Sequence, residues 1–364
     1  MTFNKIYLAK SKMNNLKIFI IKYLGWRNWS VLVYNSIIEN IFIVFYIALC
    51  QDIVVSYFFT DLSFFILFSV FSTTYGYLVN DLADMELDAR QGKNNTFQED
   101  SKGKATIIVV FFAVLSILFG LHFADNALFI ILWFTWLFSA TFYSLKPFRL
   151  KERGKTGLII VVLAQRVLPI LLLFAAFKYY VWIEVMILTS YVLFRGLSSD
   201  LNHQLGDYYN DAGTRTQTYA VSAGMNWARK IFRASLEIEK TLLLAVLAVM
   251  YVNWHLPSVY GISLMAPVLV FYLLLYVYNL RKSLVLALEY INPFVHGRKN
   301  LFQFLHHGFP SVVLPFYLLM ILIYIHWQFV VIFILLAAYR RLYSLDVVLN
   351  SYPARLLRRF MSSG

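Results

Sequence analysis

Two groups of acidic residues stand out in a chain of 364 residues that contains only 19 aspartates and glutamates. The first reads Asn80-Asp81-Leu82-Ala83-Asp84-Met85-Glu86-Leu87-Asp88, and the second extends from Asp200 through Asp207 to Asp211. Each group follows an apolar segment. Carboxylates placed at the edge of a bilayer are costly unless they have partners. The two groups together therefore predict shared cations.

The first group has the spacing of one helical face. If the preceding apolar segment continues as a helix, Asp81, Asp84 and Asp88 recur at i, i+3 and i+7, and Asn80 shares a face with Asp84. Like charges at this spacing repel, so a cation is expected, and Mg²⁺ favours a few carboxylates together with substrate phosphates. The alternative is a solvated acidic helix end. We favour the metal site because the carboxyl end of a helix disfavours negative charge.

The second group repeats this logic. Asp200, Gln204, Asp207 and Asp211 are spaced i, i+4, i+7 and i+11, which again predicts one face of a helix. The Asp-x-x-x-Asp pairs of the two groups are offset equally, since 207 minus 84 and 211 minus 88 both give 123. This offset hints at an internal duplication of a helical unit. His203 is expected to be a hydrogen-bonded neighbour, because carboxylates and amides dominate the group.

A basic segment, residues 143–151, lies between the two acidic groups. It reads Tyr-Ser-Leu-Lys-Pro-Phe-Arg-Leu-Lys and carries Lys146, Arg149 and Lys151. Read alone, these cations fit ordinary positive-inside residues equally well. Beside two acidic groups on the same membrane face, metal-bound carboxylates and free cations instead predict a clamp for a diphosphate.

Composition indicates a multi-pass, all-α membrane protein. Hydrophobic residues make up 60% of the chain and charged residues 14%, and the mean hydropathy is +0.66. Many apolar runs approach the roughly 20 residues of a spanning helix, whereas a β-barrel would show short alternating segments. The net charge of +13 lies in short loops, as the positive-inside rule predicts, so no nucleic-acid partner is expected. Cys50 is the single cysteine, which excludes a structural role for disulfides.

Nine transmembrane spans are predicted. They lie near residues 31–50, 62–79, 106–123, 127–142, 158–177, 181–197, 241–254, 262–280 and 312–339. We expect one transmembrane catalytic domain over residues 31–339. It is preceded by a basic interfacial segment over residues 1–30, in which no cleavage site is evident, and followed by a basic amphipathic tail over residues 340–364.

The distribution of basic loops predicts the orientation in the cytoplasmic membrane. Loops 90–104, 146–155, 195–240 and 281–299 are basic and should face the cytoplasm, together with both acidic groups. Nine spans would put the basic tail on the opposite side. Either the last segment is not one simple span, or the tail lies on the lipid surface.

With these motifs, the sequence resembles the UbiA superfamily of intramembrane prenyltransferases over roughly residues 26–340. The matching elements are the Asn80–Asp88 motif, the Tyr-Ser-x-x-Pro-x-basic segment at 143–151, and the second motif at Asp207 and Asp211, with Thr218 where that motif usually continues. The resemblance implies nine transmembrane helices around a central cavity under a cytoplasmic cap. It also implies a magnesium-dependent transfer of an isoprenyl group from its diphosphate to a small, aromatic acceptor.

The resemblance also implies roles for individual residues. Two Mg²⁺ ions would be held by Asn80, Asp81, Asp84, Asp88, Asp207 and Asp211. The diphosphate would be bound by Lys146, Arg149, Lys151 and Arg215, and Tyr143 joins the five aspartates as a catalytic candidate. The acceptor candidates are Arg27, Asn35 and His203, although an interfacial anchor and a helix-packing amide explain Arg27 and Asn35 at least as well. Tyr75 and Tyr208 neighbour the motifs.

Departures from the family pattern keep other functions open. Residues 89–104 lack the Arg-Pro element that commonly follows the first motif, and the second motif is preceded by an unusual Asn-His-Gln-Leu-Gly. The alternatives are a terpene cyclase, with capture of the carbocation inside its own chain, and a transferase of phosphosugars to polyprenyl phosphate. A cation- or proton-coupled transporter is a weaker alternative, because it would place carboxylates at mid-bilayer. His296, His306 and His307, in an enlarged polar loop, are read as surface residues.

Overall fold

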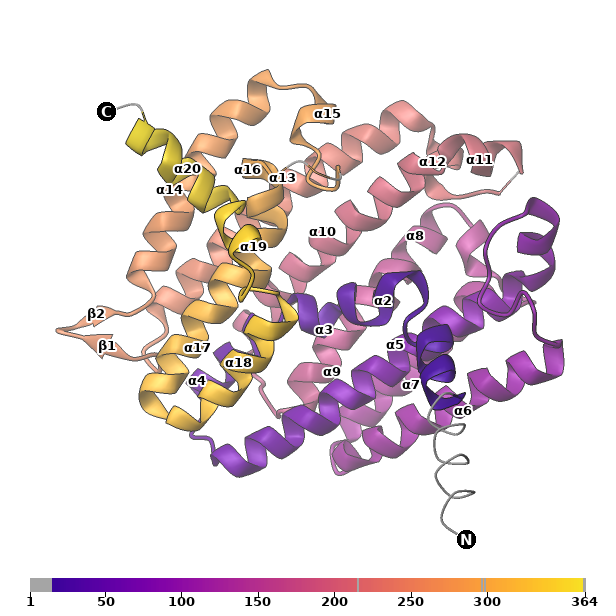
Figure 1. The fold of residues 1–364 in the computed structure, drawn as a ribbon, viewed down its shortest axis with the longest axis horizontal. Helices are drawn as coiled ribbons and strands as arrows, with labels where there is room; N and C mark the ends of the chain where they lie inside the picture. Colours follow the sequence, from indigo (N-terminus) through magenta and orange to yellow (C-terminus); the bar gives the residue numbers. More distant parts are fainter. Residues whose placement is uncertain (1–14, 215, 296, 298, 363–364) are drawn as a thin grey trace, which may run out of the picture. The chain divides into compact units, whose positions relative to one another are not determined.

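The computed structural model describes residues 15–214, 216–295, 297 and 299–362, and these residues are mainly helical. They fold into two compact units, each made of two chain segments. The first unit comprises Met1–Glu39 and Thr60–Ala176, and the second comprises Asn40–Phe59 and Phe177–Gly364. Figure 1 shows the elements of each unit along the chain.

The first unit is a bundle of long apolar helices. Its elements are a helix over residues 15–23, then α2 (Trp26–Val33), α3 (Ser36–Glu39), most of α5 (Val55–Gln91), α6 (Lys102–Gly120), α7 (Ala127–Ser144), α8 (Lys155–Val162), a π-helical stretch (Leu163–Val167) and α9 (Leu168–Ala176). The helices α6 and α7 begin at capping residues, because Ser101 Oγ accepts from Lys104 N–H and Asn126 Oδ1 accepts from Leu128 N–H. Aromatic rings fill the interior, and Phe68 contacts Phe65, Phe129 and Trp133.

The second unit is also helical, with one small hairpin. It contains α4 (Phe42–Cys50), α10 (Trp182–Gly206), α11 (Tyr208–Gly213), α12 (Tyr219–Ala223), α13 (Met225–Val252), the strands β1 (Ser258–Val259) and β2 (Ile262–Ser263), α14 (Ala266–Val285), α15 (Leu288–Ile291), α16 (Leu301–Gln303), a π-helix (Phe304–Val313), α17 (Leu314–Ile325), α18 (Val330–Tyr339), α19 (Leu345–Leu349) and α20 (Tyr352–Ser362). The helices α10 and α13 pack side by side (Figure 1).

Six helical segments among the described residues are long and apolar enough to cross a membrane: 55–90, 102–123, 127–144, 155–176, 266–285 and 301–325. The predicted all-α membrane architecture is therefore confirmed, whereas the number of nine spans stays a prediction. The expected span over 31–50 is not one helix, because α2, α3 and α4 are separated at Tyr34–Asn35 and Asn40–Ile41. The expected span over 262–280 begins later, at Ala266, because β2 occupies its first residues.

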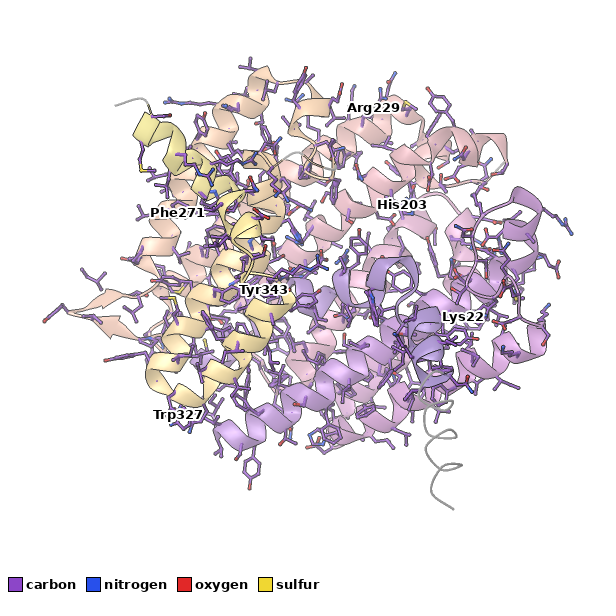
Figure 2. All side chains as sticks on the ribbon, in the orientation of Figure 1. Lys22, His203, Arg229, Phe271, Trp327 and Tyr343 are labelled. Carbon is purple, nitrogen blue, oxygen red and sulfur yellow. The ribbon has the colours of Figure 1, made fainter. Side chains whose placement is uncertain are left out.

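The last apolar segment, expected as one span over 312–339, is two helices. The helix α17 ends at His326, whose backbone is extended, and α18 follows and packs beside α17 (Figure 1). Trp327 lies at this turn (Figure 2). Arg355 of α20 donates to the backbone carbonyl of Lys299, in the loop before α16. The basic tail therefore contacts the loop that precedes α16, and the orientation of the tail in the membrane stays a prediction.

Candidate functional site

The first acidic motif meets the basic segment inside the first unit. The helix α5 continues without interruption from the apolar segment to Gln91, as its spacing predicts, and carries Asn80 and Asp84 on one face. Arg149 Nη2 lies 3.1 Å from Asp84 Oδ1, and Lys151 Nζ pairs with the other carboxylate oxygen. Lys151 also donates to Asn80 Oδ1 at 3.0 Å, and Ser144 Oγ donates to the same oxygen at 2.7 Å. Two cations and two motif residues therefore share one polar cluster.

A tight turn aims the basic segment at α5. Arg149 has a left-handed backbone (φ 38°), a conformation that costs a non-glycine residue about 1–3 kcal/mol and concentrates at functional sites. Its Nε donates to Glu152 Oε1 at 2.6 Å, which leaves Nη2 for Asp84. Gly157 of α8 packs against this turn, since a Cβ there would lie 2.7 Å from the Leu150 carbonyl oxygen. The close approach of α8 therefore supports the position of Lys151.

Burial changes the pKa of Lys151, the cation at the centre of this cluster. The side chains of Asp84 and Lys151 are 13% and 15% exposed. Burial lowers the pKa of Lys151, and its pairing with Asp84 offsets only part of this effect. A ligand with more negative charge than one carboxylate would stabilise the charged form of this lysine better than Asp84 does.

The other two aspartates of the first motif hold the loop that follows α5. Asn95 Nδ2 donates to the Asp81 carbonyl (2.9 Å) and to Asp88 Oδ2 (2.8 Å). Thr96 donates to Asp81 Oδ2 through its N–H at 3.2 Å and through its hydroxyl. Asp81 is buried, with 2% of its surface exposed. The expected stripe of three equivalent carboxylates is thus divided: Asp84 faces the basic segment, and Asp81 and Asp88 face the loop.

Thr96→Val should destabilise the protein without changing the charge of the motif. Losing a buried hydrogen bond to a carboxylate costs about 1.5–3 kcal/mol, so the midpoint of thermal unfolding in detergent should fall by several degrees. Thr106→Val is the matched control, because the Thr106 hydroxyl bonds only its own helix on an exposed face. An equal loss of stability in both variants would argue against a loop anchored by Asp81.

The second acidic motif lies in the second unit, and its helix is interrupted. The helix α10 ends at Gly206 and α11 begins at Tyr208, so Asp207 and Asp211 do not continue the regular face of Asp200 and Gln204. Gln204 donates to Asp200 Oδ2 at 2.8 Å and accepts from the Ala220 N–H at 3.1 Å. His203 Nδ1 lies 3.1 Å from Asp207 Oδ2; the His203 side chain is exposed (Figure 2), and that of Asp207 is about half exposed. Asp211 is half-buried. Arg215 lies outside the described residues.

The other predicted site residues range from exposed to fully buried. Tyr143 is half-buried on the last turn of α7, and Lys146 is exposed. Asn35 is buried, and its amide donates to Ser69 Oγ (3.0 Å) and Thr73 Oγ1 (3.2 Å) and caps α3 at the Ile37 N–H. These contacts match the helix-packing role weighed for it. The Arg27 side chain lies outside the described part of the structure, and the acceptor roles stay predictions.

Three functional candidates escape sequence reasoning, and one histidine is corrected. Asn95 and Thr96 contact the motif from 14 and 15 residues away, and no spacing signal marks them. Ser144 belongs to the basic segment, yet a serine at a helix end carries no specific signal. His306, read as a surface residue, is 7% exposed and lies 2.7 Å from Glu239 Oε1. That interpretation was wrong because residues 304–313 are a buried π-helix.

The donor chemistry of the first motif fits magnesium. Within the described residues, no three acidic, histidine or cysteine side chains lie together as a complete metal cage. Mg²⁺ does not need such a cage, because it takes one or two carboxylates and completes its coordination with water and substrate phosphates. Asn80 and Asp84 offer hard oxygen atoms on one face, beside cations that suit phosphate. The residues therefore fit an ion bound together with a diphosphate.

Comparison with solved structures identifies proteins of similar fold. A sequence comparison with curated proteins gave no match. The fold is similar to that of a UbiA homolog from Archaeoglobus fulgidus bound to DMAPP and Mg²⁺, with a TM-score of 0.53 and 17% identity, covering 83% of this chain and 98% of that one. The same homolog bound to GPP and Mg²⁺ gives a TM-score of 0.54 and 16% identity over the same shares of both chains.

The family model decides the assignment. The model of the UbiA prenyltransferase family matches residues 41–287, which include both acidic motifs and the basic segment between them. Together with the membrane-spanning helices, this match shows that the chain is an integral membrane protein and belongs to the UbiA prenyltransferase family.

Proposed function

We propose that this protein is a magnesium-dependent prenyltransferase that ionises an isoprenyl diphosphate and transfers the isoprenyl group to a small, aromatic acceptor. The observation that carries the proposal is the cluster in the first unit, where Asn80 and Asp84 meet Arg149 and Lys151. Binding of DMAPP and of GPP with Mg²⁺ by the similar archaeal homolog supports it.

In this proposal the ion pairs between Asp84 and the two cations, Arg149 and Lys151, are replaced by contacts with the ligand when substrate binds. Without ligand, Asp84 and the two cations neutralise one another. A magnesium diphosphate would bring both signs of charge: Asp84 would hold the metal ion, and Lys151 and Arg149 would bind the phosphate oxygens. The second acidic motif, with Asp207 and Asp211, would hold a second ion. The exchange preserves charge pairing throughout, which matters in a half-buried site.

The chemistry then follows from stabilising the leaving group. Bound Mg²⁺ supplies positive charge for the departing diphosphate. The bond between C1 and the bridging oxygen breaks heterolytically, and its electron pair leaves with the diphosphate. The allylic cation is captured by an electron-rich atom of the acceptor, which afterwards loses a proton. Lys151 and Arg149 bind the charge that develops, and the apolar helices exclude water that would otherwise quench the cation.

Affinity for the diphosphate should depend on pH through Lys151. The lowered pKa of Lys151 means that this lysine loses its proton at a lower pH than an exposed lysine does. Because the diphosphate binds the protonated form, its KM should rise as the pH increases through that lowered pKa. Lys151→Arg keeps its charge, so the rise should move to higher pH. Measured KM against pH checks this, and an identical alkaline rise in both proteins would exclude Lys151 as its source.

Product analysis tests the proposal itself. Purified protein in liposomes is incubated with Mg²⁺ and geranyl, farnesyl or geranylgeranyl diphosphate, each with and without phenolic acceptors. The expected result is a prenylated acceptor and free diphosphate, formed only when metal and acceptor are both present. A cyclic hydrocarbon formed without acceptor would show that the reaction is cyclisation and not transfer. Intact substrate under every condition would contradict both reactions.

A further inference from the structure

The helix α10 carries two polar stripes with different tasks. The acidic stripe contains Asp200 and Gln204, at i and i+4, and Asp207 follows it as the residue that ends the helix. A second stripe, wholly inside α10, contains Arg195, Ser198 and Asn202, at i, i+3 and i+7. At 100° per residue, the two stripes point in directions roughly 170° apart. Whatever holds the second stripe therefore sets the direction in which the acidic stripe points.

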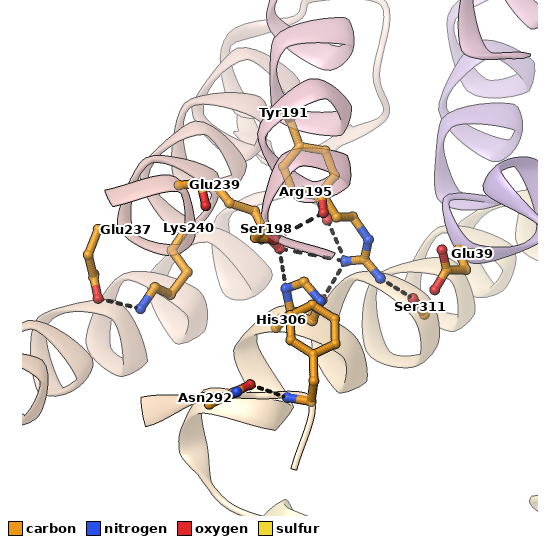
Figure 3. A network of polar contacts seen from close by, with 12 residues as sticks. Glu39, Tyr191, Arg195, Ser198, Glu237, Glu239, Lys240, Asn292, His306 and Ser311 are labelled. Atoms are coloured by element: carbon orange, nitrogen blue, oxygen red, sulfur yellow. Dashed lines mark hydrogen bonds and ion pairs between the residues drawn. The ribbon is translucent and has the colours of Figure 1, made fainter. Parts of the chain in front are cut away.

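The second stripe is held by a buried network (Figure 3). Ser198 Oγ donates to Glu239 Oε2 of α13 at 3.0 Å, and Arg195 Nη1 lies 3.9 Å from Glu239 Oε1. His306 Nδ1 approaches the same Oε1 at 2.7 Å. Arg195 also donates to Tyr191 Oη (2.9 Å) and to Ser311 Oγ (3.2 Å). Arg195 and Glu239 are each only 2% exposed, so both charges depend on these partners.

Arg195 also contacts the backbone of the π-helix, which contains Pro310. Arg195 Nη1 donates to the His306 carbonyl. The guanidinium therefore joins α10 directly to the backbone of the π-helix.

A third attachment joins α10 to the loop before α16. Asn292 Nδ2 donates to Asn202 Oδ1 at 2.9 Å, and Asn292 Oδ1 accepts from the Phe294 N–H at 2.9 Å. The Phe294 ring packs edge-on against the His306 ring, with 4.6 Å between centroids. The loop and the π-helix therefore act on the same stripe of α10 over two helical turns.

We propose that Arg195, Glu239, His306 and Asn292 are positioning residues that fix the rotation of α10 and thereby direct the acidic stripe toward its metal ion. The inference rests on the proposed function, because the acidic stripe needs a direction only if it binds a metal. None of the four residues needs to touch substrate. Supporting residues of this kind change metal affinity by about 10–100-fold when they are removed.

Manganese binding tests the inference without turnover. Mn²⁺ is titrated into purified full-length protein in detergent, with inorganic diphosphate present, and the free ion is measured by electron paramagnetic resonance. Glu239→Gln should weaken Mn²⁺ binding 10–100-fold. Glu237→Gln is the matched control on the same helix, because Glu237 pairs with Lys240 at 2.9 Å and accepts from Asn279 Nδ2 of α14 at 3.4 Å. It should keep the wild-type affinity even where it lowers thermal stability.

A milder pair of variants covers the case in which Glu239→Gln does not fold. Asn292→Ala removes only the loop attachment, and Asn300→Ala, in the same loop, removes the cap at the Gln303 N–H instead. Only Asn292→Ala should weaken Mn²⁺ binding. Equal Mn²⁺ affinity of wild type, Glu239→Gln and Asn292→Ala would overturn the positioning role alone. Wild-type protein that binds no Mn²⁺ with diphosphate would overturn the proposed function as well.

Discussion

Asp84→Asn should lower the rate of isoprenyl diphosphate turnover by about 10²–10³-fold, the effect of removing one group that stabilises developing charge. The substitution keeps the size of the side chain and removes the charge that meets Arg149 and Lys151. In the ligand-free protein the two cations then compete for one amide. With substrate, the metal loses a carboxylate ligand. Steady-state release of diphosphate measures the effect.

Glu86→Gln is the control for this experiment. Glu86 lies two residues along α5 and is exposed, so its loss removes the same charge from the same helix without touching the cluster. Its turnover should remain near that of wild type. Circular dichroism and thermal unfolding in detergent establish that the Asp84 variant is folded. Equal turnover of the folded Asp84 variant and wild type would remove Asp84 from the reaction.

Lys151→Met should change the affinities for the two ligands in opposite directions. The diphosphate loses a half-buried cation, and the loss of such a partner weakens binding by about 100-fold. Mg²⁺ alone should bind more tightly, because Lys151 no longer competes for Asn80 and Asp84. Calorimetry with inorganic diphosphate and with Mg²⁺, each added separately, measures both effects.

Lys155→Met separates this exchange from a general effect of charge. Lys155 begins α8, four residues after Lys151, and is exposed. Its removal lowers the net charge equally and should leave both affinities nearly unchanged. If Mg²⁺ binding weakened in Lys151→Met, the lysine and the metal would not share Asp84, and the proposed exchange would be wrong.

The sequence was sufficient for the part of the site that rests on local periodicity. The apolar run into Asp88 predicts one helix, and α5 is one helix. Charge and the predicted membrane face indicated that the first acidic group and the basic segment form one site, and Asp84 indeed pairs with Arg149 and Lys151. Nothing local, however, shows that Asp81 is buried under Thr96, because that contact depends on how the loop folds back.

Longer-range features were beyond the sequence pattern. The turn at His326 divides a continuous apolar segment, and neither glycine nor proline stands at the turn itself, so hydropathy alone predicts one span. The Arg195 network joins residues 41 and 111 positions apart, and its partners looked like ordinary loop and helix charges. His306 was misread for the same reason. Its burial follows from the packing of the π-helix against α10 and α13, which no spacing rule describes.

The central claim is that the protein ionises an isoprenyl diphosphate, and positional isotope exchange tests it whatever the acceptor is. Geranylgeranyl diphosphate labelled with ¹⁸O at the bridging position is incubated with the protein and Mg²⁺, and recovered substrate and released diphosphate are analysed by mass spectrometry. We expect the label to enter non-bridging positions or free diphosphate, only with metal and far more slowly in Asp84→Asn. The claim would be contradicted if the wild-type protein, with Mg²⁺ present, left all of the label at the bridging position of the substrate for every isoprenyl chain length.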